Sequence, residues 1–283
     1  MKTLLGMVTF GNIEFTKLAI QSIEDTSKTE LDYFIVVGKP GDTATLDWLQ
    51  TKPNIKYIVH SENMGFPYSI NDIFDYAWVI NNYDYVILAG NDIIAYPFCI
   101  DSLLESAQTT DNACVSALQI DVNMLTILYP GTAEYFSGSN KIFTDFTQSP
   151  WNIFNGYSAV LTVAPSQLHD IQNLCLYKRE VFDVIGYADV NFYPAYFVDN
   201  DYAMRIIKAG IKGCTLTNAR FFHFWSRTIK QGEGGSTDKQ FGNNAKYYRQ
   251  KWGGDFGKET NIPPVKISDR TSEVETINYW KAK

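Results

Sequence analysis

The chain has 283 residues, of which 45% are hydrophobic and 19% are charged. These values are typical of a globular protein with a sizeable core, and they exclude a chain dominated by disorder. The formal net charge of -7 argues against a general polyanion-binding protein, because such proteins carry a basic face that replaces phosphate counterions.

The chain shows no pattern for export, membrane insertion or zinc binding. Its four cysteines are scattered without paired spacing, which indicates reduced, partly buried thiols rather than a zinc site or a redox motif. The apolar run at the N-terminus is too short for a signal peptide and predicts a first strand. No segment reaches the roughly 20 apolar residues that a membrane helix requires. We therefore expect a cytoplasmic protein without a transmembrane segment.

Strand-like and helix-like segments alternate through the first half of the chain, as expected for a mainly parallel sheet flanked by helices. The predicted strands there are 4–9, 33–37, 55–59, 83–88 and 113–118. The predicted helices are 15–25, 44–50, 69–80 and 98–107. Residues 124–164 have poor periodicity and predict hairpins and loops, where binding residues often gather.

Regular periodicity returns in the second half of the chain. The predicted elements are strands at 174–177 and 215–224 and helices at 178–185, 200–209 and 241–251. The residues after Gly253 show little periodicity. They predict a tail that wraps the domain or pairs with another subunit, which leaves a homo-oligomer open.

The apolar run 83–88 is the most informative segment, because it stops at Gly90-Asn91-Asp92. Ligands of open α/β sheets collect outside the carboxyl ends of such strands. Asp92 is therefore placed where it could coordinate a hard divalent cation that is shared with substrate phosphates. The alternative is that Gly-Asn-Asp forms an ordinary turn.

Four short segments occur in the order typical of inverting glycosyltransferases of family 2 with the GT-A fold, and the chain resembles that family. The segments are Asn63-Met64-Gly65-Phe66 with Asn71, Gly90-Asn91-Asp92, Val198-Asp199-Asn200-Asp201 with Arg205, and Lys251-Trp252-Gly253. The resemblance implies an α/β, Rossmann-like GT-A domain over 1–253 and a tail over 254–283. Within that domain it implies a nucleotide-sugar-binding half over 1–120 and an acceptor-binding, catalytic half over 121–253.

The resemblance also implies a nucleotide-diphosphate sugar donor and a divalent metal, Mn²⁺ or Mg²⁺. The family's base-contacting acid falls at Gly38, which leaves Asp42 as a displaced candidate. The first acid of the family's Asp-X-Asp motif falls at Gly90, which leaves Asp92 as the metal ligand. His223 lies where some relatives supply a metal-binding histidine, although a histidine among aromatic residues is often a packed side chain. The implied donor-binding residues are Thr9, Asp42, Asn63, Gly65, Asn71, Asn91, Asp92 and Arg227.

Asp199 matches the family's catalytic acid. In a single displacement with inversion, such a base removes the proton of the attacking hydroxyl while metal stabilises the departing diphosphate. Val198 replaces the Glu that commonly precedes this residue. We expect Asp201 to cap a helix, Arg205 to form a local ion pair, and Trp252 to be structural.

The acceptor and two rival functions stay open at this point. The acceptor hydroxyl could belong to a glycan, a lipid, a protein or a modified nucleobase. A nucleotidyltransferase would use a related scaffold and the same metal chemistry, but the sequence offers only Gly11-Asn12 where a Gly-rich signature is expected. A non-catalytic nucleotide- or sugar-binding protein would account for the acids that are missing at Gly38, Gly90 and Val198.

Overall fold

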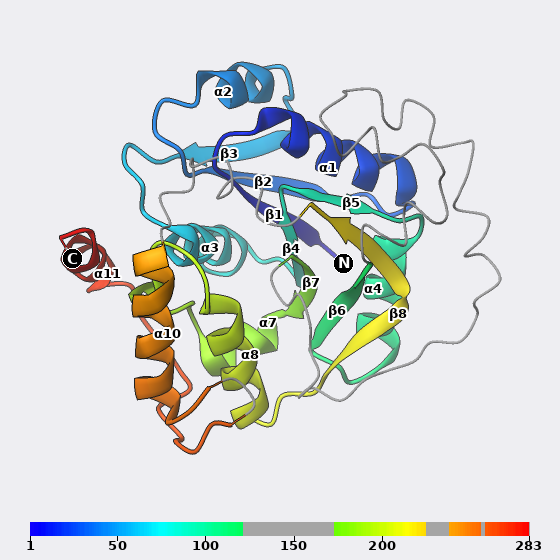
Figure 1. Cartoon of the computed structure of the whole chain (residues 1–283). Helices are drawn as coiled ribbons and strands as arrows, with labels where there is room; N and C mark the ends of the chain where they lie inside the picture. The colour runs from blue at the N-terminus through cyan, green and yellow to red at the C-terminus, as the bar shows by residue number, and fades with distance from the viewer. Residues whose placement is uncertain (121–172, 225–237, 256–257, 283) are drawn as a thin grey trace.

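The computed structural model describes residues 1–120, 173–224, 238–255 and 258–282. Within these residues, helices pack on both faces of an eight-stranded sheet (Figure 1). The predicted loop region 124–164 lies outside the described residues. None of the described helices has the length and apolar character needed to cross a membrane.

The sheet has the strand order β3-β2-β1-β4-β7-β6-β8-β5. Its strands are β1 Thr3–Thr9, β2 Asp32–Val37, β3 Ile55–Val59, β4 Tyr85–Gly90, β5 Ile93–Ala95, β6 Cys114–Ile120, β7 Leu174–Lys178 and β8 Gly213–His223. Of the strands in this described sheet, β5 and β7 run against the other six. The sheet is therefore mixed and mostly parallel, as predicted. The carboxyl ends of β1, β4, β6 and β8 share one edge, which is where sheets of this kind bind ligands.

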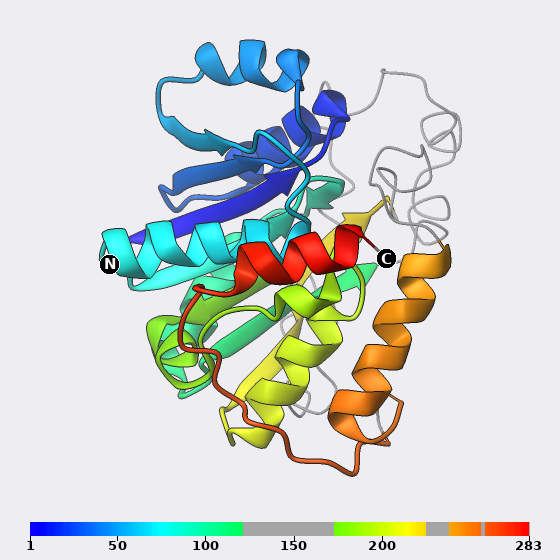
Figure 2. The same ribbon diagram turned by 90° about the vertical axis from the view of Figure 1, so that its left-hand side faces the viewer.

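The helices cover the sheet in two layers. They are α1 Ile13–Thr26, α2 Thr43–Gln50, α3 Phe66–Phe74, α4 Cys99–Thr109, α7 Arg179–Ile185, α8 Val198–Lys208, α10 Asp238–Trp252 and α11 Glu273–Lys281, with a π-helical turn η1 Asp75–Ile80 after α3 and a 3-10 turn η4 Val190–Phe192. Figure 2 shows α3, α8, α10 and α11 together on one side of the sheet. Helices α1 and α4 pack on the opposite side.

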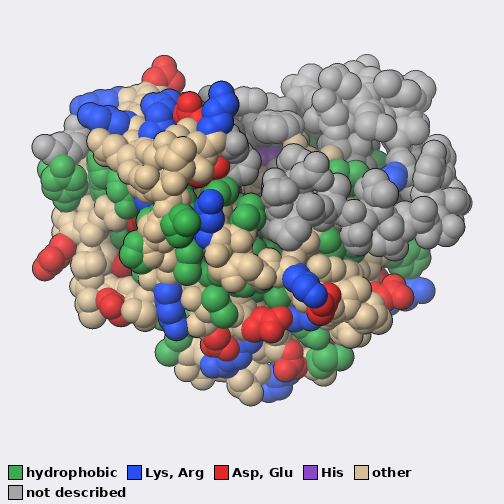
Figure 3. All heavy atoms as spheres, turned by 90° about the horizontal axis from the view of Figure 1, so that it is seen from below, with side chains coloured by type: hydrophobic (Ala, Val, Ile, Leu, Met, Phe, Trp, Pro, Cys, Tyr) green, Lys and Arg blue, Asp and Glu red, His purple; other side chains and the backbone are tan. Residues whose placement is uncertain are grey.

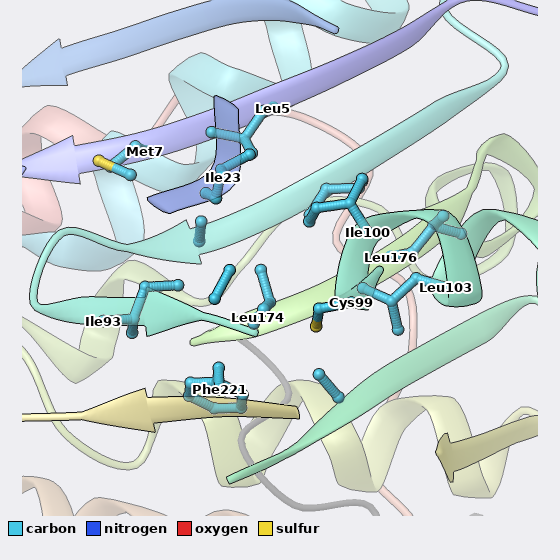
Figure 4. Close-up of a cluster of buried hydrophobic side chains, with 14 of the residues drawn as sticks. Leu5, Met7, Ile23, Ile93, Cys99, Ile100, Leu103, Leu174, Leu176 and Phe221 are labelled. Carbon is cyan, nitrogen blue, oxygen red and sulfur yellow. The ribbon is translucent and has the colours of Figure 1, made fainter. Parts of the chain in front are cut away.

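Each face of the sheet buries its own apolar core. Along β1, Leu4 belongs to the core under α3, α7 and α8, whereas Leu5 belongs to the core under α1 and α4. Figure 4 shows the second core, in which Leu5 lies near Ile23 of α1. Because successive side chains of a strand point to opposite faces, strands covered on both faces read as continuous apolar runs. The four cysteines are buried as free thiols, which agrees with the sequence-based expectation of reduced cysteines.

Among the described elements, the short strand β5, the 3-10 turn η4 and the C-terminal helix α11 were not predicted. Strand β5 has only three residues, which is too few for any periodicity to be recognised. Helix α11 buries only Glu273 and Ile277, so it lacks the apolar stripe by which an amphipathic helix is recognised. Polar contacts with distant residues, rather than apolar periodicity, place this helix.

Arg270 and Glu273 attach the C-terminal segment to the α3 side of the molecule. The Arg270 guanidinium contacts Asp72 Oδ1 at 2.7 Å, Asp75 Oδ2 at 2.6 Å and Glu273 Oε2 at 2.6 Å. Asn71 Nδ2 donates to Glu273 Oε1 at 2.5 Å. The described part of the tail therefore lies against its own chain, as one of the two sequence-based alternatives proposed.

Glu273 makes the stability of this attachment depend on pH. Burial raises the pKa of Glu273 from about 4.5 to about 7, although Arg270 and Asn71 oppose the shift. The folded state then binds more protons than the unfolded state between these two pKa values, so the free energy of unfolding falls as pH rises through that window. Between pH 4.5 and 7 the free energy of unfolding of the wild type should fall by up to about 3 kcal/mol because of this group. Glu273→Gln should not show this fall.

The measurement is urea unfolding of both proteins from pH 4.5 to 7.5. The stability of Glu273→Gln relative to the wild type should increase with pH. Glu275→Gln is the matched control, because Glu275 is an exposed carboxylate of the same helix and should leave the pH dependence unchanged. Parallel pH curves for the wild type and Glu273→Gln would contradict the raised pKa.

Candidate functional site

Asp92 and His223 meet at the carboxyl-end edge of the sheet. Asp92 lies in the turn between β4 and β5, and His223 is the last residue of β8, which pairs with β5. Asp92 Oδ1 lies 3.1 Å from His223 Nε2. The N–H of Phe224 donates to the backbone carbonyl of Asp92 at 2.9 Å and fixes the turn against β8. The fold thus brings together the two residues predicted as metal ligands.

Gln119, near the end of β6, orients the histidine ring. The Nδ1–H of His223 donates to Gln119 Oε1 at 3.1 Å. This bond leaves the other ring nitrogen, Nε2, facing the Asp92 carboxylate. Metal-binding histidines characteristically donate their second N–H to a neighbouring acceptor in this way.

The chemistry of this pair fits a hard divalent cation. Adjacent ligands about 2.1 Å from an octahedral ion lie roughly 3 Å apart, which is close to the separation of Asp92 Oδ1 and His223 Nε2. Among the described residues, no three His, Cys, Asp or Glu side chains gather into a group that could hold a metal by themselves. Asp92 and His223 would therefore share an ion with ligands from elsewhere, such as water or a diphosphate.

Thr9 and Asn91 are joined beside this pair through Thr16 of α1. Asn91 Nδ2 donates to Thr16 Oγ1 at 3.2 Å, and the hydroxyl oxygens of Thr9 and Thr16 lie 3.1 Å apart. All three side chains are buried. This chain of hydrogen bonds ties the end of β1 and helix α1 to the turn that carries Asp92.

The predicted donor loop at Asn63 and Gly65 forms the turn that starts α3. Asn63 Oδ1 accepts from the Gly65 N–H at 2.9 Å, and Gly65 has a φ of 82°. A Cβ at Gly65 would lie 2.8 Å from the Tyr193 ring, so both the backbone angle and the packing require glycine. The Phe66 N–H donates to the Pro194 carbonyl at 2.7 Å, which holds this loop against the segment that leads to α8.

Asp42 and Asn71 form contacts within the scaffold. Asp42 is the N-cap of α2, and its carboxylate accepts from the Thr45 N–H at 3.2 Å and from Thr45 Oγ1 at 2.6 Å. The Asn71 side chain is fully buried and exchanges hydrogen bonds with both backbone groups of Ala188. These hydrogen bonds hold the scaffold together, and they do not connect Asp42 or Asn71 to the Asp92 site. Arg227 lies outside the described residues.

Asp199 is an exposed residue in the first turn of α8. The positive end of the helix dipole favours a carboxylate at this position. Tyr196 and Phe197, which lead into the helix, both have left-handed backbone angles, with φ of 71° and 64°. The helix begins earlier than predicted, at Val198, which places Asp199 in its first turn.

Asp201 has a different role from the predicted helix cap. It is fully buried, and its carboxylate binds Arg205 Nε at 2.9 Å, Trp252 Nε1 at 2.9 Å and Lys251 Nζ at 2.6 Å. The prediction of a cap was wrong because the side chain faces the core, where these donors meet it. The predicted Arg205 ion pair and the structural role of Trp252 are confirmed.

Lys251 extends this buried cluster to a second acid. Its ammonium group lies 2.7 Å from Asp189 Oδ2. Burial alone would raise the pKa of Asp189, but Lys251 and the amide groups of Asn191 hold that pKa below its ordinary range. Two of the sequence segments that carry the resemblance, around Asp201 and around Lys251, thus contact each other.

Comparison with known proteins supports the fold. No protein-family model matches the sequence, and no curated protein matches it. Among solved structures, a mannosyltransferase, PcManGT from Pyrobaculum calidifontis in complex with GDP-Man and Mn²⁺, aligns at 12% identity with a TM-score of 0.54. The alignment covers 80% of this chain and 57% of the mannosyltransferase chain. The structure of S. aureus TarS 1-349 aligns at 12% identity with a TM-score of 0.54, covering 89% of this chain and 72% of that one.

The chain has the GT-A fold of glycosyltransferases. In this GT-A fold, the edge that carries Asp92 and His223 is formed by the carboxyl ends of the parallel strands. Gln119 and Thr16, beside the Asp92–His223 pair, and Tyr193, beside the Asn63–Gly65 turn, were not predicted. A polar residue near the end of a predicted strand was the one available signal for Gln119; the roles of Thr16 and Tyr193 depend on contacts that only the folded chain reveals.

Proposed function

We propose that this chain transfers a sugar from a nucleotide-diphosphate sugar to a hydroxyl acceptor, by a single displacement with inversion. The observation that carries the proposal is the pairing of Asp92 with His223, oriented by Gln119, at the ligand-binding edge of a GT-A fold. The likeness to a mannosyltransferase solved with GDP-Man and Mn²⁺ supports this reading, and at 12% identity it is evidence for the fold.

Asp92 and His223 would hold a divalent cation, Mn²⁺ or Mg²⁺. Such a cation supplies electrostatic stabilisation for the negative charge of the departing diphosphate. Thr9, Thr16 and Asn91 keep the Asp92 turn in register with β1 and α1. The site is therefore preorganised by the protein before any ligand enters.

The donor and the acceptor would bind at the starts of two different helices. On the donor side, the turn at Asn63 and Gly65 would lie beside the nucleotide sugar, at the start of α3. On the acceptor side, Asp199 at the start of α8 would accept the proton of the attacking hydroxyl. Acidic and basic side chains are interspersed on the described part of the face seen in Figure 3, which argues against that face as a nucleic-acid-binding surface.

A thermal-shift panel tests this proposal. Nucleoside diphosphates and nucleotide sugars of each base are added with and without Mn²⁺ or Mg²⁺, since a ligand that binds the native state raises the melting temperature. We expect one nucleotide series to stabilise the protein in a metal-dependent way. Asp92→Asn should abolish the metal-dependent part. Asp84→Asn is the matched control, because Asp84 is an exposed acid just before the other end of β4.

The possible results separate this function from its rivals. Stabilisation that needs both metal and Asp92, together with turnover of the same nucleotide sugar, would support the transferase. Nucleotide binding without turnover across a broad acceptor panel would favour the non-catalytic binding protein. Stabilisation by no nucleotide under any metal condition would contradict the donor site.

A further inference from the structure

An exposed aromatic cluster lies beside the proposed catalytic acid. Phe241, near the start of α10, is 47% exposed. Its ring centroid lies 5.2 Å from that of Tyr196 and 5.2 Å from that of Phe197. Asp199 follows Phe197 by two residues and is itself exposed. The three aromatic side chains, here called the aromatic platform, therefore lie at the same end of α8 as Asp199.

The backbone of the aromatic platform is held in an unusual conformation. Left-handed backbone angles are rare for bulky residues and persist only where the surroundings enforce them. Asn244 of α10 supplies this enforcement from a fully buried position. Its Nδ2 donates to the carbonyls of Ala195 at 2.6 Å and Tyr196 at 3.3 Å.

A purely packing role does not explain this arrangement. Phe197 is anchored on its inner side by the Tyr248 ring, at 5.8 Å between centroids. Tyr196 and Phe197 remain only partly buried, and Phe241, the outermost ring, keeps nearly half of its surface in water. An apolar core would bury such rings, whereas a binding surface keeps them rigid and accessible.

We propose that the aromatic platform binds a sugar ring of the acceptor, so that the acceptor class is a carbohydrate. The inference rests on the proposed function, because the role of Asp199 as the base is what places an acceptor here. A pyranose has an apolar face of C–H groups and a polar rim of hydroxyls. The C–H face packs on the electron-rich face of an aromatic ring, and a rim hydroxyl is then directed towards the neighbouring carboxylate.

Saturation-transfer NMR with simple methyl glycosides tests the proposal. The probes are methyl glycosides of glucose, galactose, mannose and N-acetylglucosamine, added to the Mg²⁺-loaded protein with the nucleoside diphosphate that stabilises it. We expect ring C–H signals from at least one glycoside with the wild type. Phe241→Ala should weaken its binding roughly tenfold. Phe241→Trp, which keeps an aromatic face, should retain it.

Phe98→Ala is the matched control. Phe98 is 41% exposed and lies at the start of α4, on the opposite side of the sheet, so its replacement should leave glycoside binding unchanged. Nucleotide-dependent stabilisation should be the same in all three variants, because none of the changed side chains belongs to the donor site. That result would also show that the variants are folded.

The readouts distinguish failure of the platform from failure of the proposed function. If no glycoside binds the wild type while nucleotide still stabilises it, the carbohydrate platform is wrong and the donor site stands. If a prenyl phosphate or a serine peptide gives signals that depend on Phe241 and the glycosides give none, the carbohydrate assignment is likewise overturned. If no nucleotide stabilises the protein, the proposed function fails, and the platform fails with it.

Discussion

Replacement of Asp201 by asparagine is expected to lower the free energy of unfolding by about 3–5 kcal/mol. Asp201 and Arg205 are both fully buried, and their side chains meet at 2.9 Å. Asparagine keeps the size of the side chain but removes its charge, so the Arg205 guanidinium is left in the core without its closest carboxylate. Lys251 still pairs with Asp189, so Arg205 is the one cation of this cluster that loses its carboxylate.

Urea unfolding followed by circular dichroism measures this loss. Asp183→Asn is the matched control, because Arg179 and Asp183 have the same four-residue spacing on α7 but are 42% and 57% exposed. Exposed pairs of this kind contribute about 0.3–0.5 kcal/mol, so the control should be close to neutral. If both variants lost the same small amount, the buried pair would not contribute as proposed.

A second replacement shows whether the loss comes from the unpaired charge. Arg205→Met removes the buried cation, so adding it to Asp201→Asn should recover part of the lost stability. Strict additivity of the two single losses would mean that the two side chains act independently. The cycle therefore isolates the ion pair from the other contacts of Asp201.

The strands and most helices could be predicted because each carries local information. Strands such as β1 and β4 are covered on both faces, so they appear in the sequence as continuous apolar runs between turn residues. Helix α7 ends at Gly186, whose φ of 67° marks a helix stop that the sequence also displays. Such signals lie within a few residues of the element that they define.

The contacts that depend on distant residues could not be predicted. Helix α11 is placed by Arg270, which reaches Asp72 and Asp75, about two hundred positions earlier in the sequence. The sequence of the tail has no local pattern that predicts these partners. The same limit applies to Asp201. It was predicted to cap a helix, but its carboxylate binds Trp252 and Lys251, which lie on α10.

The candidate site was predicted only in part, because some of its contacts also depend on distant residues. Asp92 follows β4 and His223 ends β8, and strand direction places the carboxyl ends of these two strands on one edge of the sheet. Their contact depends on β5, which pairs with β8 and was not predicted. Asn71 was placed in the donor site by its position in a motif, and Asp42 as a displaced candidate for the motif acid that is missing at Gly38. The structure shows their side chains bonded to Ala188 and Thr45, respectively. Motif position identifies the neighbourhood of a residue, whereas its role depends on which way the side chain faces.

Replacement of Asp199 by asparagine is expected to lower the turnover of the nucleotide sugar by a factor of about 10²–10⁴, the usual contribution of a general base. The amide keeps the shape of the side chain and its place in the first turn of α8, but it cannot accept the proton of the acceptor hydroxyl. Asp199 is exposed whereas Asp201 is buried, so the loss of its charge should cost less stability than the loss at Asp201. Stability and nucleotide binding should therefore stay close to those of the wild type.

Release of the nucleoside diphosphate is the measured quantity, with acceptor and donor varied separately. Glu180→Gln is the matched control, because Glu180 is an exposed acid in the first turn of α7 and shares the helix-terminal position of Asp199 without its place beside the aromatic platform. A loss in kcat for Asp199→Asn, with donor affinity and the control unchanged, would assign proton transfer to this carboxylate. Unchanged turnover would remove Asp199 from the proposed mechanism and leave the proposed metal and donor site at Asp92 in place, because the proposal assigns the two acids to different substrates.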